Sequence, residues 1–377
     1  MKERVVLIDF LNDGHHAVYA STLLNGLHSA GYEVIFIGTS ALIDQLSSIV
    51  LLNSGIECIS IKQRSFSGVL NEINKLFSFK DALIEISKLK PDIIHFLQLD
   101  RFMFGICLSR LLFNNIRLVS TLHWCGVILA NNLTLKSHIN SILFRHLLRN
   151  SKVISHSRET NNIIVGTLKN NLHYAPYPMH EDCLDLDSIL KKKALMRADL
   201  GVAESDKLLL CFGGARYDKG LDTAIDALRF LDISYRLLIA GKEEDFTQTT
   251  LMMQAEKLGV SDRILFRMVF IEERKVIDYF CASDCVLVPY KLSFTGQSGP
   301  LVYAASIGIP VIGSTAPIIK ETIDEYRLGK VFNAGDAYEL ASAITTCDLE
   351  LRNPVLFKDC HSQARFCQHV IEAYTIG

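Results

Sequence analysis

The stretch LLLCFGGARYDKG, residues 208–220, is an apolar strand that runs into two glycines and then presents Arg216 and Lys219 three residues apart. Gly213 and Gly214 allow backbone N–H groups to approach a ligand closely. Arg216 can grip phosphate oxygens as a planar fork, and Lys219 adds a compact charge. The pattern is typical of a turn that holds a diphosphate. An ordinary solvated loop is the alternative for so short a motif.

On both sides of this turn, short apolar segments alternate with longer segments of helical pattern. Continuous apolar strands separated by helical patterns predict a parallel sheet buried on both faces. The alternation of strands and helices extends through one half of the chain and begins again in the other. We therefore expect an α/β fold of two Rossmann-like, doubly wound domains that face each other across a cleft. The predicted strands are 4–10, 33–38, 56–61, 92–97 and 117–122, then 207–212, 235–241, 263–268, 284–289, 309–314 and 330–335.

The length of 377 residues favours two domains, because one hydrophobic core rarely grows so large. Pro176 and Pro178 interrupt any helix at the expected boundary, where acidic residues replace the apolar rhythm. A hinge is expected there. The predicted division is an N-terminal acceptor domain at 1–175, a linker at 176–187, a C-terminal donor domain at 188–357, and a helix at about 358–377 that packs back onto the first domain.

Composition excludes several classes of protein. Lys and Arg total 39 against 41 Asp and Glu, and the formal charge of -2 gives no basic field for nucleic acid. The ten cysteines lack the paired spacing of a zinc site and are interpreted as reduced thiols. The apolar run at the start is too short for a secretory signal, and no stretch reaches the length of a membrane span. We expect a cytoplasmic protein.

The mean hydropathy of +0.23 is high for a soluble enzyme and is compatible with a membrane contact. Residues 136–152 place Ile139, Ile142, Leu143 and Leu147 on one face of a predicted helix, with basic residues elsewhere. Such a helix can lie on an anionic membrane surface, here the inner face. An ordinary amphipathic helix that packs on a sheet is the alternative.

Open parallel sheets bind ligands beyond the carboxyl ends of their strands, which selects the loops that matter. Gly14, His15 and His16 follow the first strand and precede a helix, where N–H groups attract anions. They are expected to meet a phosphate or a sugar, although a simple helix cap by Asn12 or Asp13 explains the same pattern. The segment has no GxGxxG, which argues against a dinucleotide-dependent oxidoreductase.

His123 follows the fifth predicted strand and is the best side chain of the first half for chemistry in a cleft. A histidine held by packing and one hydrogen bond is the structural alternative.

The second half contains another glycine loop. Residues 290–313 read YKLSFTGQSGPLVYAASIGIPVIG, a strand end, a loop, and a helix that opens at Gly299 and Pro300. Backbone N–H groups of Gln297, Ser298 and Gly299 are expected to bind an anion or sugar hydroxyls. A plain cap by Ser298 is compatible with that role.

Together these motifs resemble the GT-B glycosyltransferases, specifically the retaining group of family four. The resemblance rests on the family's order of Arg216 to Gly220, Ala240-Gly241, Ala282-Ser283-Asp284 and Gly308 to Ile312. It implies a GT-B fold and transfer of a sugar, with retention, from a nucleotide diphosphate donor to a hydroxyl acceptor in glycan or polysaccharide assembly. It implies no cofactor and no metal, and a carbohydrate or lipid-linked acceptor.

The resemblance also implies roles for individual residues. Arg216 and Lys219 neutralise the departing diphosphate, His123 lines the donor-sugar pocket, and the loop of Gly14 approaches the donor phosphates or the acceptor. The remaining expected donor contacts are Gly213, Gly214, Gly241, Gly296, Gln297, Ser298, Gly299, Pro300 and Tyr303.

One departure from the family concerns two glutamates of the second glycine loop. Their positions hold Thr295 and Tyr303, which can hydrogen-bond but offer no carboxylate to a ribose diol. Glu321 matches a glutamate that follows the next strand. A catalytically silent GT-B protein that binds a nucleotide sugar or a partner transferase is therefore an alternative, and a nucleotide-sugar epimerase is a third.

Overall fold

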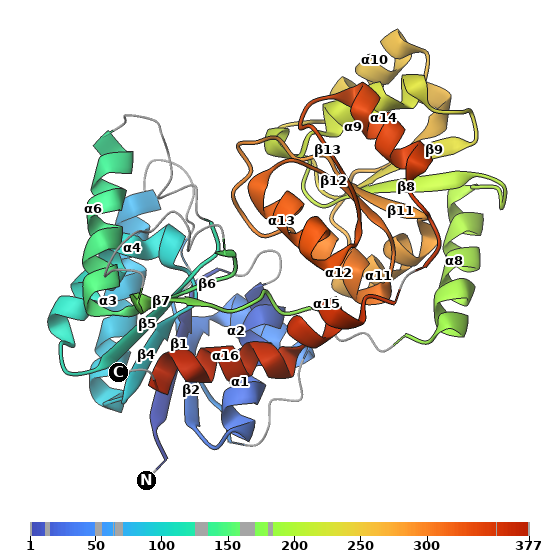
Figure 1. The fold of residues 1–377 in the computed structure, drawn as a ribbon. Helices are drawn as coiled ribbons and strands as arrows, with labels where there is room; N and C mark the ends of the chain where they lie inside the picture. The colour runs from blue at the N-terminus through green and yellow to red at the C-terminus, as the bar shows by residue number, and fades with distance from the viewer. Residues whose placement is uncertain are drawn as a thin grey trace. The chain divides into compact units, whose positions relative to one another are not determined.

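The computed structural model divides the chain into two compact units (Figure 1). It describes residues 2–11, 16–49, 55–62, 64, 71–124, 135–158, 170–179, 184–351 and 353–375. The first unit comprises Met1–Pro178 and His361–Gly377, and the second comprises Met179–Cys360. Each unit has its own parallel sheet and its own core.

The first unit is built on a seven-stranded sheet with the order β3-β2-β1-β4-β5-β6-β7. All neighbouring strands are parallel. The order reverses between β1 and β4, as in a doubly wound Rossmann-like sheet. Its elements are β1 (Arg4–Asp9), α1 (His16–Ser29), β2 (Glu33–Thr39), α2 (Ser40–Ile49), β3 (Glu57–Ile61), α3 (Asn71–Leu89), β4 (Ile93–Phe96), α4 (Leu99–Leu112), β5 (Arg117–Leu122), α6 (Leu135–Asn150), β6 (Lys152–Ser155), β7 (Leu172–Tyr174) and α16 (Gln363–Thr375).

The apolar segments of this half form strands that are buried on both faces, because helices cover both faces of the sheet. β4 is buried along its whole length, and β1 is buried from Val5 to Asp9. The five strands predicted for this half are present, and β5 has the predicted bounds. The sequence analysis missed β6 and β7, which have only four and three residues and lie at one edge of the sheet. Such short runs carry little periodicity.

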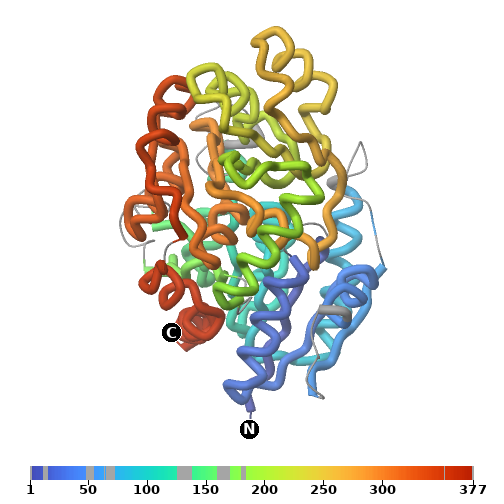
Figure 2. The backbone as a smooth tube through the Cα atoms, turned by 90° about the vertical axis from the view of Figure 1, so that its right-hand side faces the viewer, coloured from blue at the N-terminus to red at the C-terminus, as the bar shows by residue number. Residues whose placement is uncertain are grey.

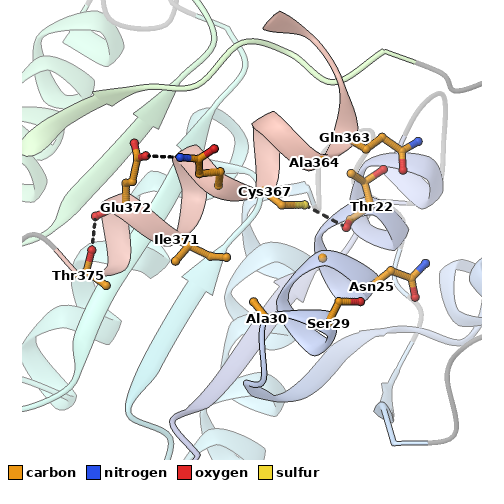
Figure 3. A pocket seen from close by; sticks show the side chains of 12 residues that line it. Thr22, Asn25, Ser29, Ala30, Gln363, Ala364, Cys367, Ile371, Glu372 and Thr375 are labelled. Carbon is orange, nitrogen blue, oxygen red and sulfur yellow. Dashed lines mark hydrogen bonds between the residues drawn. The ribbon is translucent and has the colours of Figure 1, made fainter. Parts of the chain in front are cut away.

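Helix α16 completes the first unit from the far end of the chain. Figure 2 shows the red C-terminal segment returning to the first unit, where α16 packs against α1. Phe366, Val370 and Tyr374 are buried, and the Tyr374 hydroxyl lies 2.7 Å from Nδ1 of His95 on β4. A groove of about 630 Å³ remains between α1 and α16 (Figure 3).

The second unit has a six-stranded sheet with the order β10-β9-β8-β11-β12-β13. All pairs are again parallel, so the prediction of two Rossmann-like sheets is confirmed. Its elements are α8 (Leu186–Leu200), β8 (Lys207–Phe212), η2 (Tyr217–Lys219), α9 (Leu221–Ala227), η3 (Leu228–Phe230), β9 (Tyr235–Ala240), α10 (Gln248–Leu258), η4 (Ser261–Arg263), β10 (Ile264–Arg267), α11 (Glu273–Ala282), β11 (Cys285–Val288), α12 (Gly299–Ile307), β12 (Val311–Ser314), α13 (Pro317–Tyr326), β13 (Gly329–Phe332), α14 (Ala337–Thr346) and α15 (Val355–Cys360).

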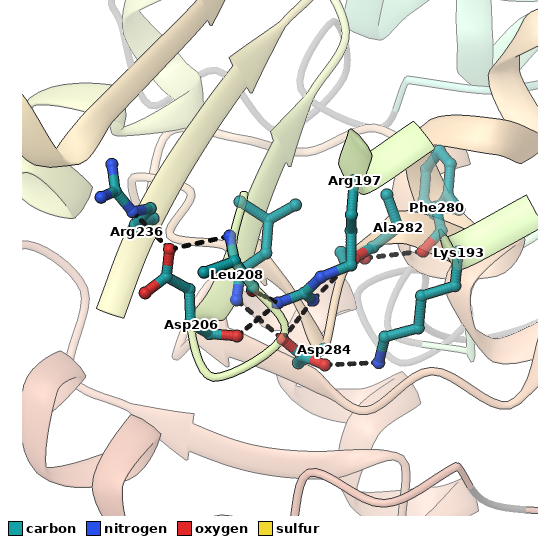
Figure 4. A network of polar contacts seen from close by, with 10 residues as sticks. Lys193, Arg197, Asp206, Leu208, Arg236, Phe280, Ala282 and Asp284 are labelled. Atoms are coloured by element: carbon teal, nitrogen blue, oxygen red, sulfur yellow. Dashed lines mark hydrogen bonds and ion pairs between the residues drawn. The ribbon is translucent and has the colours of Figure 1, made fainter. Parts of the chain in front are cut away.

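A polar network fixes α8 to this sheet (Figure 4). The carboxylate of Asp284, just before β11, accepts from Lys193 Nζ at 2.5 Å and from Arg197 Nη1 at 3.0 Å. It also accepts from the backbone N–H of Leu208 on β8 at 2.7 Å. The Arg197 side chain is 8% exposed, so its charge is buried and paired. One carboxylate thus joins a helix to two strands.

The helix predicted at 136–152 exists as α6, but its buried face differs from the predicted one. Phe144, Leu147 and Leu148 are buried, whereas Ile139 and Ile142 are 46% and 65% exposed. The packing stripe is shifted because α6 packs against α4 as well as the sheet. Among the described helices, none combines the length and the apolar composition that a membrane span requires.

Candidate functional site

The strand order of each sheet reverses at one position, and His16 of the first unit and the glycine turn of the second follow strands beside it. In the second unit, β8 lies between β9 and β11, and the loops that follow these three strands meet at the carboxyl edge of the sheet. In the first unit, the corresponding position lies beyond β1 and β4. Ligands of open parallel sheets bind at such switch points, because the two flanking loops diverge there and leave a crevice.

Glycines bring the loops of the second unit into direct contact. Gly213 has a φ of +102°, and its N–H donates to the Ala240 carbonyl at 2.8 Å. Gly241 has a φ of +135°, and a Cβ there would lie 2.3 Å from the Gly213 carbonyl oxygen. A side chain at Gly241 would therefore push the two loops apart. A role of these glycines in donor binding stays a prediction.

Arg216 lies at the edge of this turn with its side chain 30% exposed. Its Nε and Nη2 donate to the two carboxylate oxygens of Asp218 at 3.0 and 2.9 Å. Its guanidinium carbon lies 5.9 Å from the ring centre of Phe294, in the loop after β11. The fork geometry that suits a phosphate is thus preformed by an internal carboxylate.

The side chain of Lys219 folds back against the same glycine turn. Its Nζ lies 3.4 Å from the Phe212 carbonyl oxygen and 2.5 Å from the position that a Cβ on Gly213 would take. Burial, and then the positive charge of Arg216, lower the pKa of Lys219 to about 8. The carboxylates of Asp218 and Glu244 oppose this shift. Lys219 and Arg216 are therefore close enough to act on one ligand.

Glu244 is a member of this cluster that the sequence analysis missed. Its Oε1 lies 1.9 Å from the position that a Cβ on Gly214 would take, so the carboxylate covers that glycine. An anion at the glycine turn and the carboxylate of Glu244 cannot both occupy this space. The only indication in the sequence was its place three residues after Gly241, in the loop that follows β9.

The second glycine loop is anchored by Ser298 and Tyr290. The Ser298 hydroxyl donates to the Tyr290 hydroxyl at 3.1 Å and accepts from the backbone N–H of Leu301 at 3.3 Å, which caps α12. The Tyr290 ring lies 5.9 Å from Lys219 Nζ and 4.4 Å from the ring of Phe294. This loop therefore borders the cations of the first loop.

The other predicted donor contacts of this loop differ in exposure. Gln297, Gly299 and Pro300 are half-buried, and Gly296 is buried. Tyr303 is 4% exposed, and its ring lies 4.6 Å from that of Phe280, which belongs to the core. The structure thus gives Tyr303 a packing role, and donor contact by this residue stays a prediction. Thr295 is half-buried in the loop itself.

In the first unit, His16 begins α1 at the switch point. Its Nδ1 lies 2.8 Å from Oδ2 of the buried Asp9, at the end of β1, and 3.2 Å from Nε2 of Gln98, in the loop after β4. With the proton on Nδ1, His16 donates to the Asp9 carboxylate, and in the other tautomer Nδ1 accepts from the Gln98 amide. Gly14 and His15 lie outside the described residues. Asp9 and Gln98 are polar residues of this position that the sequence analysis did not select.

His123 follows β5 and is held in a cluster of aromatic side chains. Its Nε2 donates to the Leu97 carbonyl at 2.9 Å, and its ring lies 5.0 Å from those of Tyr19 and His156. Burial is the main cause that lowers the pKa of His123, so the imidazole is neutral near pH 7. With Nε2 protonated, Nδ1 is an acceptor. This single tautomer suits either a packed histidine or a contact with a hydroxyl.

Comparisons with known proteins define the family. A model described as glycosyl transferases group 1 matches residues 192–350, and one described as Glycosyltransferase Family 4 matches residues 16–174. The two matches lie side by side along most of the chain. Comparison with curated protein sequences finds no match.

Solved structures share the fold of the whole chain. Alr3699/HepE of Anabaena, in complex with UDP, aligns with a TM-score of 0.75 at 16% identity and full coverage of both chains. Sucrose-phosphate synthase of Thermosynechococcus elongatus aligns at 0.71 and 16% identity, over 99% of this chain and 95% of the other. WaaG, a glycosyltransferase involved in lipopolysaccharide biosynthesis, aligns at 0.65 and 16% identity, over 99% and 100%.

The chain belongs to the GT-B glycosyltransferases of the family-four type. It is therefore a glycosyltransferase, and glycosyltransferases of this class use nucleotide-sugar donors. This confirms the predicted resemblance to GT-B glycosyltransferases of family four, while retention stays a prediction.

Proposed function

We propose that this enzyme transfers a sugar from a nucleoside diphosphate donor to a hydroxyl acceptor with retention of anomeric configuration, in glycan or polysaccharide assembly. The observation that carries the proposal is the pair of Arg216 and Lys219 at the switch point of the second sheet, beneath two glycine loops. HepE was solved with UDP and with UDP-glucose, so uridine diphosphate sugars are the first donors to test.

Electrostatic stabilisation is the main contribution of the proposed site. As the glycosidic C–O bond breaks, negative charge grows on the departing diphosphate. The Phe294 ring beside Arg216 and the Phe212 carbonyl beside Lys219 hold the two cations in place, so they need little rearrangement at that moment. A diphosphate displaces Asp218 and Glu244 from the cations because it carries more charge and more acceptor oxygens. Two fixed cations can hold such a leaving group without a metal ion.

We propose that residues of the first unit contact the donor sugar or the acceptor. His123 offers Nδ1 as an acceptor to a sugar hydroxyl, because the Leu97 carbonyl fixes its tautomer. His16 contacts Asp9 at the switch point, and Gly14 and His15, which lie outside the described residues, precede it in the sequence. We infer that this loop contacts the donor phosphates or the acceptor.

The direct experiment measures nucleoside diphosphate release from a panel of nucleotide sugars, with and without candidate acceptors. Arg216→Ala and Lys219→Ala are each expected to lower kcat/KM by about a hundredfold or more. Lys257→Ala, at an exposed position of α10, is the matched control and should leave the rate unchanged. The anomeric configuration of the product, determined by NMR, tests retention.

Other outcomes of the same experiment support the alternatives. Binding of a nucleotide sugar without turnover under every acceptor would favour the catalytically silent GT-B protein. A donor recovered as its epimer would favour the epimerase. Full activity of Arg216→Ala would remove the proposed role of the cation pair.

We further infer peripheral contact with an anionic membrane, which suits a lipid-linked acceptor. Phe104, Leu108 and Leu111 form an exposed stripe on α4, at 59%, 38% and 67% exposure. The exposed Ile139 and Ile142 lie on the adjacent α6. The exposed side chains of Arg101, Arg145 and Arg149 lie on the same two helices. Apolar side chains flanked by arginines bind anionic surfaces.

A flotation assay tests this contact. The wild-type protein should float with vesicles that contain anionic lipid, and Leu111→Glu with Ile142→Glu should reduce the floating fraction. Equal flotation with neutral vesicles, or no effect of the double variant, would reject the contact. Circular dichroism checks that the variant is folded.

A further inference from the structure

Two histidines and a glutamate gather at one edge of the first unit, on elements that the proposed reaction does not use. His173 lies on β7, the edge strand of the seven-stranded sheet, and His369 and Glu372 lie on α16. One nitrogen or oxygen from each residue lies within 4.8 Å of the others. Among the described residues, this is the group of His, Cys, Asp and Glu side chains with spacing suited to a metal ion.

The two residues of α16 are arranged as a pair by the helix. His369 and Glu372 are three residues apart, so they share one face, and Nδ1 of His369 lies 3.3 Å from Oε2 of Glu372. The other carboxylate oxygen of Glu372 accepts from Gln368 Nε2 at 3.2 Å (Figure 3). A neighbour that orients a carboxylate in this way is typical of the surroundings of a metal ligand.

His173 supplies the third group from the sheet. Its Nε2 is buried and has no hydrogen-bond partner among the described residues. A buried nitrogen without a partner is unfavourable, which points to a missing ligand.

We propose that His173, His369 and Glu372 bind a divalent transition metal ion of the Zn²⁺ class. Two imidazoles and one carboxylate are an established donor set for this ion, which takes four ligands and leaves the fourth position here to water. Ligand atoms around tetrahedral zinc lie about 3.3–3.6 Å apart, from bond lengths of about 2.0–2.2 Å. The 3.3 Å pair on α16 already meets this value, and side-chain rotation of the partly exposed His369 closes the longer distances.

The proposed ion joins helix α16 to the sheet of the first unit. Its ligands come from β7 and from α16, which are distant in sequence, so binding stabilises the docked position of α16. The side chains of His369 and Glu372 are 28% and 43% exposed, which gives the ion access from solvent. None of these residues takes part in the proposed transfer reaction, so we expect the ion to act on the stability of the first unit.

Titration of the untagged full chain with Zn²⁺, followed by a competing chromophoric chelator, tests the proposal. One equivalent should bind, and Co²⁺ in its place should give the visible absorption of a tetrahedral site. Metal at about a hundredfold excess over its Kd should raise the unfolding midpoint of the first unit by about 5–10 °C. Removal of the metal by a chelator should reverse this shift.

Three single variants and one control separate this site from adventitious binding. His173→Asn, His369→Gln and Glu372→Gln should each weaken binding about tenfold or more and reduce the thermal shift at the same metal concentration to about half or less. His138→Gln, at an exposed histidine of α6, should bind as the wild type does. Circular dichroism and unfolding in chelator should match for all variants, which excludes loss of fold as the cause. Absence of stoichiometric binding by the wild type, or equal binding by His369→Gln and Glu372→Gln, would overturn the proposal.

Discussion

Lys219 combines a buried position with a charge that the proposed reaction needs. Burial and Arg216 lower its pKa to about 8, so it is protonated below that pH and neutral above it. We expect kcat/KM to fall as the pH rises above about 8, because the free enzyme then loses one of its two cations. A pH–rate profile between pH 6 and 10 measures this limb.

The same shift has a consequence for stability with the opposite sign. An unfolded lysine titrates near 10.5, so between about 8 and 10.5 the unfolded chain binds more protons than the folded one. The contribution of Lys219 to the free energy of unfolding therefore increases with pH in this window. Lys219→Arg keeps its charge throughout and should lose the alkaline limb of the rate profile. An unchanged limb in this variant would assign the titration to another group.

Gly220 illustrates a residue whose backbone and surroundings both require glycine. Its φ is +65°, and a Cβ there would lie 2.0 Å from the backbone oxygen of Pro289. Gly259 has a φ of +69° but nothing within 4 Å of the corresponding position. We expect Gly259→Ala to lower the free energy of unfolding by about 1–2 kcal/mol. Gly220→Ala should cost about 1–3 kcal/mol more, because a backbone atom must also move.

Denaturant unfolding of the two glycine variants measures the difference directly. Because both positions have the same backbone conformation, their comparison isolates the contact between the loops after β8 and β11. Equal losses of stability would show that these loops can separate without cost, and that the donor side of the proposed site is not held by Gly220.

At the scale of the element, Asp284 decides how α8 is attached to the second sheet. Asp284→Asn should lower the free energy of unfolding by about 3–5 kcal/mol, because the buried Arg197 loses its counter-charge. Lys320 and Asp324 form an exposed pair on α13, and Asp324→Asn is the control that should cost less than about 0.5 kcal/mol. Chemical denaturation of both variants compares them.

The acid dependence of this anchor has a defined direction. Burial raises the pKa of Asp284, but the hydrogen bonds from Lys193, Leu208 and Arg197 outweigh it and hold the pKa below its usual value. The stability from Asp284 is therefore present above about pH 3.8 and is lost as the pH falls through the lower folded-state pKa. In Asp284→Asn this part of the acid dependence should disappear.

Elements with long apolar runs could be predicted, and the shortest ones could not. The strand at 117–122 was predicted with its observed bounds, since six consecutive residues suited to a buried strand leave little ambiguity. β6 and β7 are short, and their side chains do not alternate over a length that periodicity can detect. For α6 the helix was predicted, but Ile139 and Ile142 proved exposed because a neighbouring helix, not the local pattern, selects the buried face.

At the scale of the whole molecule, acid should destabilise the first unit through its buried histidines. Burial is the main cause that lowers the pKa of His95 to about 3 and that of His361 to about 4, against 6.5 in an unfolded chain. Below pH 6.5 these histidines are protonated in the unfolded state but stay neutral in the folded state. The free energy of unfolding therefore falls as the pH falls. Between pH 7 and 5 the two groups together should cost about 4 kcal/mol.

Denaturant midpoints of the first unit at pH 7, 6 and 5 measure this loss. His361 donates from Nδ1 to the Tyr177 carbonyl at 2.7 Å, and a glutamine amide can replace that bond. His361→Gln should therefore remove about half of the pH dependence while the protein remains folded at pH 7. A midpoint that does not change between pH 7 and 5 would contradict the buried neutral state.

The sequence by itself determined the two parallel sheets and the glycine turn with Arg216 and Lys219, because these depend on the order of apolar and polar residues over short stretches. The tertiary structure alone decided that Glu244 covers Gly214, that Asp9 and Gln98 meet His16, and that Tyr303 packs in the core. It also brought His173 to His369 and Glu372. Strand order sets these contacts between distant residues, and local periodicity carries no information about strand order.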